Sequence, residues 1–254
     1  MISQNKKKLI VALAQKKKRD ETSLFLAEGR KTVHDLIVGG LTCEYLAGTR
    51  ECLEQMSVAA KEVVETTAED IATISTLQTR TEVIAILRKP DTEGLSEKRP
   101  DDLILALDEI QDPGNMGTIV RTADWFGIRT IVCSRTCADV YGMKAVAATK
   151  GALCRVGVTY CELEEWLSRV HDEWRLPIIG TFLDGENFYK AEIKTPAVVL
   201  MGNEGRGISD ALARYVSQRI LIPPFPASAT TSESLNVGAA TAVVVSEIRR
   251  RAAL

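Results

Sequence analysis

Continuous apolar runs separated by amphipathic stretches are the feature that most constrains how this 254-residue chain can fold. Uninterrupted apolar strands are typical of a sheet that helices cover on both faces, because neither side of such a strand meets water. The alternation after residue 100 therefore predicts an α/β domain with a mainly parallel sheet. The expected strands are residues 103–107, 130–133, 177–182, 197–201 and 219–222, and the expected helices are 117–126, 142–153, 163–173, 209–217 and 234–251.

A smaller α/β region precedes this domain. Its expected elements are a helix over 6–18, a strand over 23–27, a helix over 30–38 that Gly39 and Gly40 end, and a strand over 81–87. A polar segment bounded by Pro90 and Pro100 reads as a linker. The expected organisation is an N-terminal domain over 1–89, a linker over 90–100 and a C-terminal domain over 101–254.

Composition excludes several classes of protein. The longest apolar runs, such as 239–245, are far shorter than the roughly 20 residues that cross a bilayer, so no membrane association is expected. The six cysteines form no C-x-x-C pair and indicate reduced thiols and a cytoplasmic location. His34 and His171 lack metal-ligand spacing, so no metal site is expected, and no G-x-S-x-G elbow supports a serine hydrolase.

Positive charge is concentrated at the N-terminal end. Residues 1–31 hold nine Lys and Arg against three acids, a net charge of +6, whereas the whole chain carries −2. Such a cluster on an otherwise acidic protein is compatible with a surface that docks a phosphate backbone, and equally with a solvated helical face. The candidate RNA-contacting residues are Lys16, Lys17, Lys18, Arg19 and Arg30.

Polar residues collect directly after the expected strands, where ligands bind in open α/β sheets. After the strand at 103–107, a Pro-Gly turn opens a helix with Asn115 at a capping position and Arg121 further along. After the strand at 197–201, Gly202, Gly205 and Gly207 allow close backbone approach to a ligand. This spacing is neither G-x-G-x-x-G nor a P-loop, which disfavours a dinucleotide-dependent dehydrogenase and a nucleoside triphosphatase.

A third cluster enters the last expected helix. Ser234 and Asn236 precede a run of Ala and Val that reads as fully buried. Burying Asn236 without partners would cost a few kcal/mol, so the pattern indicates a specific hydrogen-bond partner for it. Together the three clusters predict a polar pocket rimmed by Arg, Glu, Ser and Asn.

These clusters resemble the three ordered motifs of the SpoU/TrmH family, which comprises S-adenosylmethionine-dependent RNA ribose 2′-O-methyltransferases of the SPOUT superfamily. The matching segments are Asn115-x-Gly117-x-x-x-Arg121-Thr122-Ala123-x-x-Phe126-Gly127, Gly202-Asn203-Glu204-Gly205-x-Gly207, and Ile222-Pro223 followed by Ser234-Leu235-Asn236-Val237. The N-terminal part, with Lys16–Arg19 leading to 25–29, resembles the ribosomal-protein-like RNA-binding domain of ribosomal RNA members.

The resemblance implies a trefoil-knotted SPOUT methyltransferase domain with a mainly parallel sheet, preceded by a small α/β RNA-binding domain. It also implies S-adenosylmethionine as the cofactor and a homodimer whose active sites are completed across a twofold axis. The residues that match family catalytic positions are Asn115, Arg121, Glu204, Ser234 and Asn236, and those that match donor-binding positions are Gly202, Ile222, Leu235, Thr181 and Leu183.

The function implied is methyl transfer to a ribose 2′-hydroxyl, in large-subunit ribosomal RNA rather than transfer RNA. Transfer-RNA members tend to lack an N-terminal domain of this kind, but they stay an alternative, as does a non-catalytic RNA-binding or assembly protein with the same fold. The segment 222–234 is longer than the family pattern and lacks its usual glycine.

Overall fold

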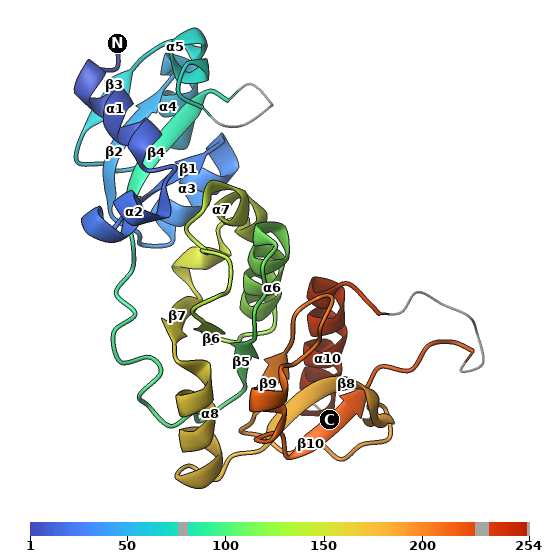
Figure 1. Cartoon of the computed structure of the whole chain (residues 1–254). Helices are drawn as coiled ribbons and strands as arrows, with labels where there is room; N and C mark the ends of the chain where they lie inside the picture. The colour runs from blue at the N-terminus through green and yellow to red at the C-terminus, as the bar shows by residue number, and fades with distance from the viewer. Residues whose placement is uncertain (76–80, 227–233, 253–254) are drawn as a thin grey trace. The chain divides into compact units, whose positions relative to one another are not determined.

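The computed structural model describes residues 1–75, 81–226 and 234–252 (Figure 1). Its contacts divide the chain into two units. The first consists of Met1–Asp91 together with Asp139–Arg155, and the second of Thr92–Ala138 together with Val156–Leu254.

The first unit is built on a mixed sheet in the order β1-β4-β2-β3. Strand β4 is antiparallel to both β1 and β2, and β2 is parallel to β3. The elements of this unit are α1 (Gln4–Ala12), α2 (Lys16–Thr22), β1 (Leu24–Glu28), α3 (Arg30–Val38), β2 (Cys43–Gly48), α4 (Arg50–Met56), β3 (Val63–Glu65), α5 (Ala68–Ala72), β4 (Val83–Arg88), α7 (Met143–Thr149) and the short 3-10 helix η1 (Ala152–Cys154).

The expected helix over 6–18 is two helices. Helix α1 ends at Ala12 and α2 begins at Lys16. The carbonyls of Leu13 and Ala14, which a continuous helix would bond to backbone N–H groups four residues later, instead accept hydrogen bonds from Nη1 of Arg19 at 2.8 Å. Leu13 itself is fully buried in the core with Ile10 and Ile84, so the break also places an apolar side chain inward.

Residues 139–155 group with the N-terminal residues, which differs from the expected continuous domains over 1–89 and 101–254. The Tyr141 ring packs on Phe25, with centroids 5.1 Å apart, and Asp139 pairs with Arg19. The expected helix over 142–153 is shorter, because α7 ends before Lys150, whose φ of 50° is left-handed, and Gly151 follows at 89°. Tertiary packing on the N-terminal unit therefore decides where this segment belongs.

The second unit contains a parallel sheet in the order β10-β8-β9-β5-β6-β7, as predicted from the apolar runs (Figure 1). Strands β5 and β9 are buried along their whole length, as their continuous apolar runs predict. The elements of this unit are β5 (Ile104–Leu107), α6 (Pro113–Trp125), β6 (Thr130–Ser134), β7 (Gly157–Cys161), α8 (Leu163–Asp172), β8 (Ile178–Asn187), β9 (Val198–Met201), α9 (Asp210–Ala213), β10 (Gln218–Leu221) and α10 (Val237–Ala252).

Sequence reasoning missed strand β7. It pairs only with β6, at the edge of the sheet, and most of its residues are half-buried. An edge strand of this kind lacks the continuous apolar run that reveals a central strand.

The expected linker is packed against the second unit. The indole Nε1 of Trp166 donates to the carbonyl of Ser96 at 2.8 Å, and Leu95 lies so close to Gly157 that a Cβ there would come within 2.5 Å of a Leu95 methyl. Within the described ranges, no helix is both long enough and apolar enough to cross a bilayer.

Candidate active site

Two loops start side by side at the carboxyl edge of the parallel sheet. Strands β5 and β9 are neighbours, and Leu107 at the end of one pairs with Met201 at the end of the other. The segments that follow, 108–112 and 202–209, therefore leave the sheet together. This edge is where open α/β sheets bind ligands.

Hydrogen bonds fasten these two loops to each other. The carboxylate of buried Asp108 accepts from the backbone N–H of Ser209 at 2.9 Å, and Asn203 Nδ2 donates to the carbonyl of Glu109 at 2.9 Å. Arg206 forms an ion pair with the Glu109 carboxylate. Sequence reasoning did not single out Asp108, Glu109 or Asn203, although Asn203 lies within the glycine-rich motif.

Glu109 adopts a left-handed backbone conformation, with φ of 53°. This conformation costs about 1 kcal/mol for a residue with a side chain, so the surrounding contacts must hold it. The Glu109 N–H donates to Ser134 Oγ at 3.0 Å, and its carbonyl accepts from Asn203. The turn therefore stores strain directly before the helix that carries Asn115.

Three of the predicted catalytic residues form one chain of hydrogen bonds. Asn236 Nδ2 donates to Asn115 Oδ1 at 2.9 Å, and Asn115 Nδ2 donates to Glu204 Oε1 at 2.8 Å. The chain joins residues that are 121 and 89 positions apart in the sequence. Its direction leaves the Glu204 carboxylate as the final acceptor, the only anionic group of the three.

Two local expectations about these residues were wrong. The N-cap of α6 is Asp112, whose carboxylate accepts from the backbone N–H of Asn115, so Asn115 lies in the first turn and its side chain is available for Glu204. Asn236 is exposed rather than buried, because it precedes the buried part of α10. Its Oδ1 accepts from the N–H groups of Gly238 and Ala239 and caps the start of that helix.

Arg121 and Ser234 lie outside this hydrogen-bond chain. Arg121 is exposed on α6, about 9 Å along the axis from Asn115, and its guanidinium forms no hydrogen bond or ion pair with any other described residue. Ser234 is exposed two residues before Asn236. A cation that the protein does not neutralise is suited to an anionic ligand.

The predicted donor-binding residues follow the ends of β8, β9 and β10. Gly202 succeeds β9, and a Cβ at this position would lie 2.2 Å from the backbone of Gly207 and Ile208, so only glycine fits. Ile222 follows β10 directly, and Leu235 precedes Asn236. Residues 227–233, which make up most of the unusually long segment 222–234, lie outside the described residues.

Thr181 and Leu183 occupy an interruption of the sheet. Strand β10 pairs with Gly180 through Arg219 and then with Glu186 through Ile220, so residues 181–185 are skipped. Strand β9 also stops pairing at Gly180. Residues 181–185 therefore pair with neither β9 nor β10. The Leu183 side chain is 74% exposed.

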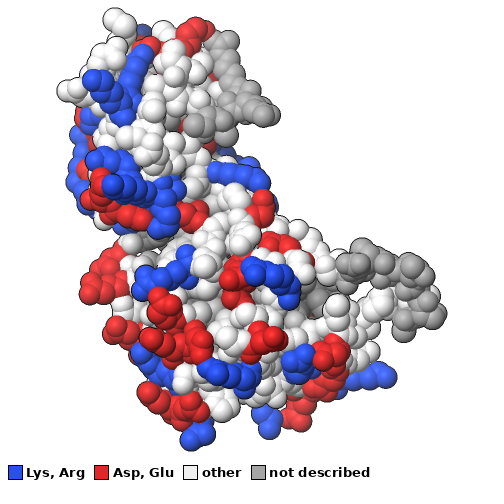
Figure 2. Space-filling view, in the orientation of Figure 1, with Lys and Arg blue, Asp and Glu red and all other residues white. Residues whose placement is uncertain are grey.

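The basic cluster of the N-terminal unit is largely neutralised by its own acids. Lys16 pairs with Asp20 at 2.6 Å and Lys18 with Glu21 at 3.3 Å, whereas Lys17 is exposed. Figure 2 shows Lys and Arg mixed with acids over α2. Arg30 is exposed and donates to Gln55.

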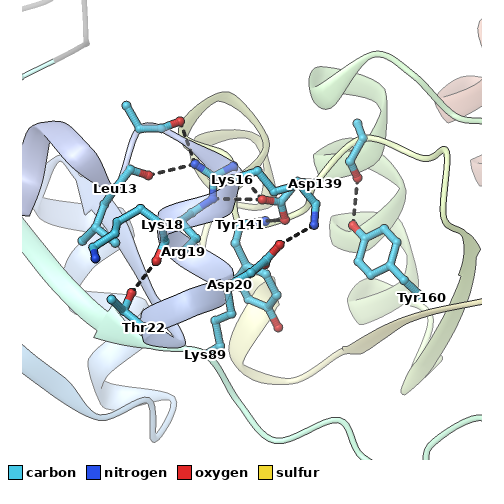
Figure 3. Close-up of polar contacts among 12 residues, drawn as sticks. Leu13, Lys16, Lys18, Arg19, Asp20, Thr22, Lys89, Asp139, Tyr141 and Tyr160 are labelled. Carbon is cyan, nitrogen blue, oxygen red and sulfur yellow. Dashed lines mark hydrogen bonds and ion pairs between the residues drawn. The ribbon is translucent and has the colours of Figure 1, made fainter.

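The expectation that Arg19 contacts RNA was wrong. Its side chain is only 6% exposed, and its guanidinium binds Asp139 and the carbonyls of Leu13 and Ala14 (Figure 3). With these donors occupied inside the fold, Arg19 joins two segments of the first unit and cannot also hold a phosphate.

Comparisons with known proteins agree with this geometry. The SpoU rRNA Methylase family model matches residues 102–246, and the MRM3-like substrate binding domain model matches residues 4–85. The solved structure of a TrmH-family protein from Porphyromonas gingivalis is 38% identical, with a TM-score of 0.87 over 99% of each chain.

Two further relatives carry more specific names. An AdoMet-bound rRNA methyltransferase structure from Sinorhizobium meliloti is 30% identical, with a TM-score of 0.82 over 99% of this chain and 97% of that one. The 23S rRNA (guanosine(2553)-2′-O)-methyltransferase RlmP of Bacillus subtilis is 26% identical over 93% of each chain. With its parallel sheet and its Asn236–Asn115–Glu204 hydrogen-bond chain, this protein belongs to the SpoU rRNA methylase family of RNA 2′-O-methyltransferases.

Proposed function

We propose that this protein transfers a methyl group from S-adenosylmethionine to a ribose 2′-hydroxyl of large-subunit ribosomal RNA. The observation that carries the proposal is the hydrogen-bond chain from Asn236 through Asn115 to Glu204, on the helix that also presents the exposed Arg121. Methyl transfer is an in-line displacement, so it depends on two bound reactants being held in alignment.

The residues at the carboxyl edge fit a methyl donor of this kind. S-adenosylmethionine, when bound, supplies a methyl group on a positively charged sulfur. The unpaired backbone of Thr181 and Leu183, together with Gly202, Ile222 and Leu235, offers main-chain polar groups for the nucleoside part. The exposed Leu183 and Leu235 side chains, 74% and 52% accessible, offer apolar contact.

Arg121 acts on the acceptor. Its guanidinium stays protonated at neutral pH, so we assign it to holding the phosphate next to the acceptor ribose and to stabilising the alkoxide that develops on the 2′-oxygen. The new C–O bond would form as the bond between the methyl group and the donor sulfur breaks, leaving a neutral thioether, and the proton of the 2′-hydroxyl would pass to solvent. Asn115, Glu204 and Asn236 hold the N-terminal end of α6 in place relative to the glycine-rich loop. Ser234 contacts the RNA.

Ribosomal RNA is the proposed substrate because of the N-terminal unit. Residues 4–85 match the substrate-binding model, and two relatives that match over nearly their whole length, from Bacillus subtilis and Sinorhizobium meliloti, bear ribosomal RNA names. Lys16, Lys17, Lys18 and Arg30 are the proposed contacts to the phosphate backbone, which governs the affinity of such surfaces.

We further propose a cytoplasmic homodimer with a trefoil-knotted catalytic domain. The last strand, β10, pairs in parallel with β8 at one edge of the sheet and not with β9, which precedes it in the sequence, and this strand order supports the knot. Trp125 is 84% exposed one turn after Arg121, and a large apolar side chain on the surface, which a second copy of the chain would bury, supports the dimer. All six cysteines are free thiols, which supports a reducing compartment.

The decisive experiment measures transfer of labelled methyl from S-adenosylmethionine into unmodified 23S rRNA and unmodified tRNA, with Arg121→Ala in parallel. We expect alkali-resistant label in the ribosomal RNA and its loss in the variant. Label in tRNA alone would replace the proposed substrate. No label in either RNA or in assembled subunits, with donor binding intact, would contradict the enzymatic function.

A further inference from the structure

Helix α3 and the segment after α7 form a single surface within the first unit. A Cβ on Gly151 would lie 2.6 Å from Asp35 Cβ, and one on Gly39 would lie 2.1 Å from Cys154 Sγ. The Cys154 thiol contacts the carbonyl of Asp35 at 3.8 Å. The segment 150–155 is therefore pressed against α3, although more than a hundred residues separate the two in the sequence.

Lys150 is placed beside the exposed face of α3 by this packing. It directly precedes Gly151, which touches Asp35, and Asp35 lies one turn after Lys31 on the same helix face. Lys31 and Lys150 are both exposed, as is Arg30 at the start of α3. We call Arg30, Lys31 and Lys150 the α3 surface.

The absence of ion pairs distinguishes the α3 surface from most of the lysines of α1 and α2. Of the six lysines on these two helices, Lys6, Lys7, Lys16 and Lys18 form ion pairs with carboxylates of the same unit, whereas Lys8 and Lys17 are exposed and pair with no described carboxylate. In the part of the chain that the structure describes, no carboxylate forms an ion pair with a residue of the α3 surface. Three acids of this region do not pair with these cations. Asp35 Oδ1 lies 3.3 Å from Nδ1 of His34, Glu51 accepts a hydrogen bond from Gln55, and Glu82 lines a hollow with Arg30 without pairing with it.

We propose that the α3 surface binds the phosphate backbone of the substrate RNA, and that Lys150, from the catalytic half of the sequence, is one of its contacts. The inference rests on the proposed function, since it assumes an RNA substrate. Unpaired cations contribute to phosphate binding without first breaking an internal ion pair, so they contribute more affinity than the neutralised lysines. A contiguous set of three cations suits a polyanion better than a protein partner.

The test compares the affinity of the full-length protein for unmodified 23S rRNA transcript over a series of salt concentrations. Lys31→Gln preserves the helix, and Lys150→Asn removes the charge with a residue that tolerates the left-handed backbone. The matched control is Lys61→Gln, because Lys61 is exposed but pairs with Glu44 and precedes β3, at the opposite edge of the sheet from β1. Thermal unfolding and donor binding of each variant should match the wild type.

We expect each single variant to weaken RNA binding about threefold at moderate salt and the double variant about tenfold. The slope of log affinity against log salt should fall by roughly 0.7 to 0.9 for each cation removed, and Lys61→Gln should leave both quantities unchanged. Unchanged affinity and slope in the double variant, or no binding of this RNA by the wild type, would overturn the inference. Failure of the proposed function is distinguishable, because it appears as absent methyl transfer by the wild type whatever the variants do to RNA affinity.

Discussion

Arg19 and Asp139 form a buried ion pair although 120 residues separate them in the sequence. Nε and Nη2 of Arg19 both donate to Oδ2 of Asp139, at 2.9 and 2.6 Å, and the two side chains are only 6% and 11% exposed (Figure 3). The pair closes the first unit by joining its N-terminal helices to a segment from the middle of the catalytic half.

Replacing Arg19 with Met should lower the free energy of unfolding by about 3–5 kcal/mol, because Asp139 would remain buried without a partner. The carbonyls of Leu13 and Ala14 would also lose their donor. Urea unfolding measures the loss. Lys16→Met is the control, since its partner Asp20 is half-exposed and such pairs contribute at most about 1 kcal/mol. Equal effects of the two substitutions would contradict a structural role for Arg19.

Asn236→Asp should reduce methyl transfer while leaving the helix cap intact. An aspartate can still accept from the N–H groups of Gly238 and Ala239, but it has no amide to donate to Asn115 Oδ1. Asn115 would then turn its amide toward the aspartate and its oxygen toward Glu204, which breaks their hydrogen bond. We expect about a 10- to 100-fold fall in kcat, as for other misaligned catalytic groups.

The unfolding temperatures of Asn236→Asp and Asn236→Ala distinguish the loss of the hydrogen bond to Asn115 from the loss of the helix cap. Asn236→Ala removes both the cap and the donation to Asn115, so it should lower stability by about 1 kcal/mol in addition to the loss of activity. If Asn236→Asp retained wild-type kcat, the hydrogen-bond chain would not be needed for alignment.

Gly202→Ala should disrupt the glycine-rich loop. Its Cβ would lie 2.2 Å from backbone atoms of Gly207 and Ile208, a distance that only a backbone shift relieves. We expect a loss of about 1–3 kcal/mol in stability and weaker S-adenosylmethionine binding, measured by thermal unfolding and calorimetry. Gly205→Ala is the control in the same loop, because its Cβ would meet only Asn203 Oδ1 at 3.7 Å. A similar loss in both variants would show that the close approach at Gly202 is not the cause.

The carboxylate of Glu247 should make stability depend on pH in the acid range. Hydrogen bonds from Arg250 and Arg251 lower its pKa from 4.5 to about 2. Because the pKa of the folded state is lowered, this contact stabilises the protein above pH 4.5, and the contribution is lost as the pH falls from 4.5 through about 2.

Unfolding temperatures measured across that window check the expectation. Glu247→Gln should unfold at a lower temperature than the wild type near neutral pH, and the difference should shrink as the pH approaches 2. Glu173→Gln serves as the control, because Glu173 is exposed and forms no ion pair with another described residue. A constant difference between wild type and Glu247→Gln over the whole range would refute the assignment.

Apolar runs in the sequence by themselves determined the parallel sheet and its central strands, and the motifs that resemble those of the SpoU/TrmH family determined the candidate catalytic residues. Short continuous apolar runs such as residues 197–201 are typical of buried strands, and Asn115, Glu204 and Asn236 lie after strand ends, where a parallel sheet brings loops together. Those inferences depend on runs of apolar residues and on short motifs, and both can be read from neighbouring positions in the sequence.

Only the tertiary structure decided how distant residues are paired. In the structure, Arg19 is buried and paired with Asp139, so it does not face RNA. Residues 139–155 group with the first unit, and Lys150 lies beside α3. Whether a lysine or arginine is neutralised depends on which carboxylate lies within ion-pair distance of it. Whether an asparagine side chain caps a helix or bonds to another side chain depends on which polar groups lie next to it. These are properties of long-range contact, and no local pattern in the sequence encodes them.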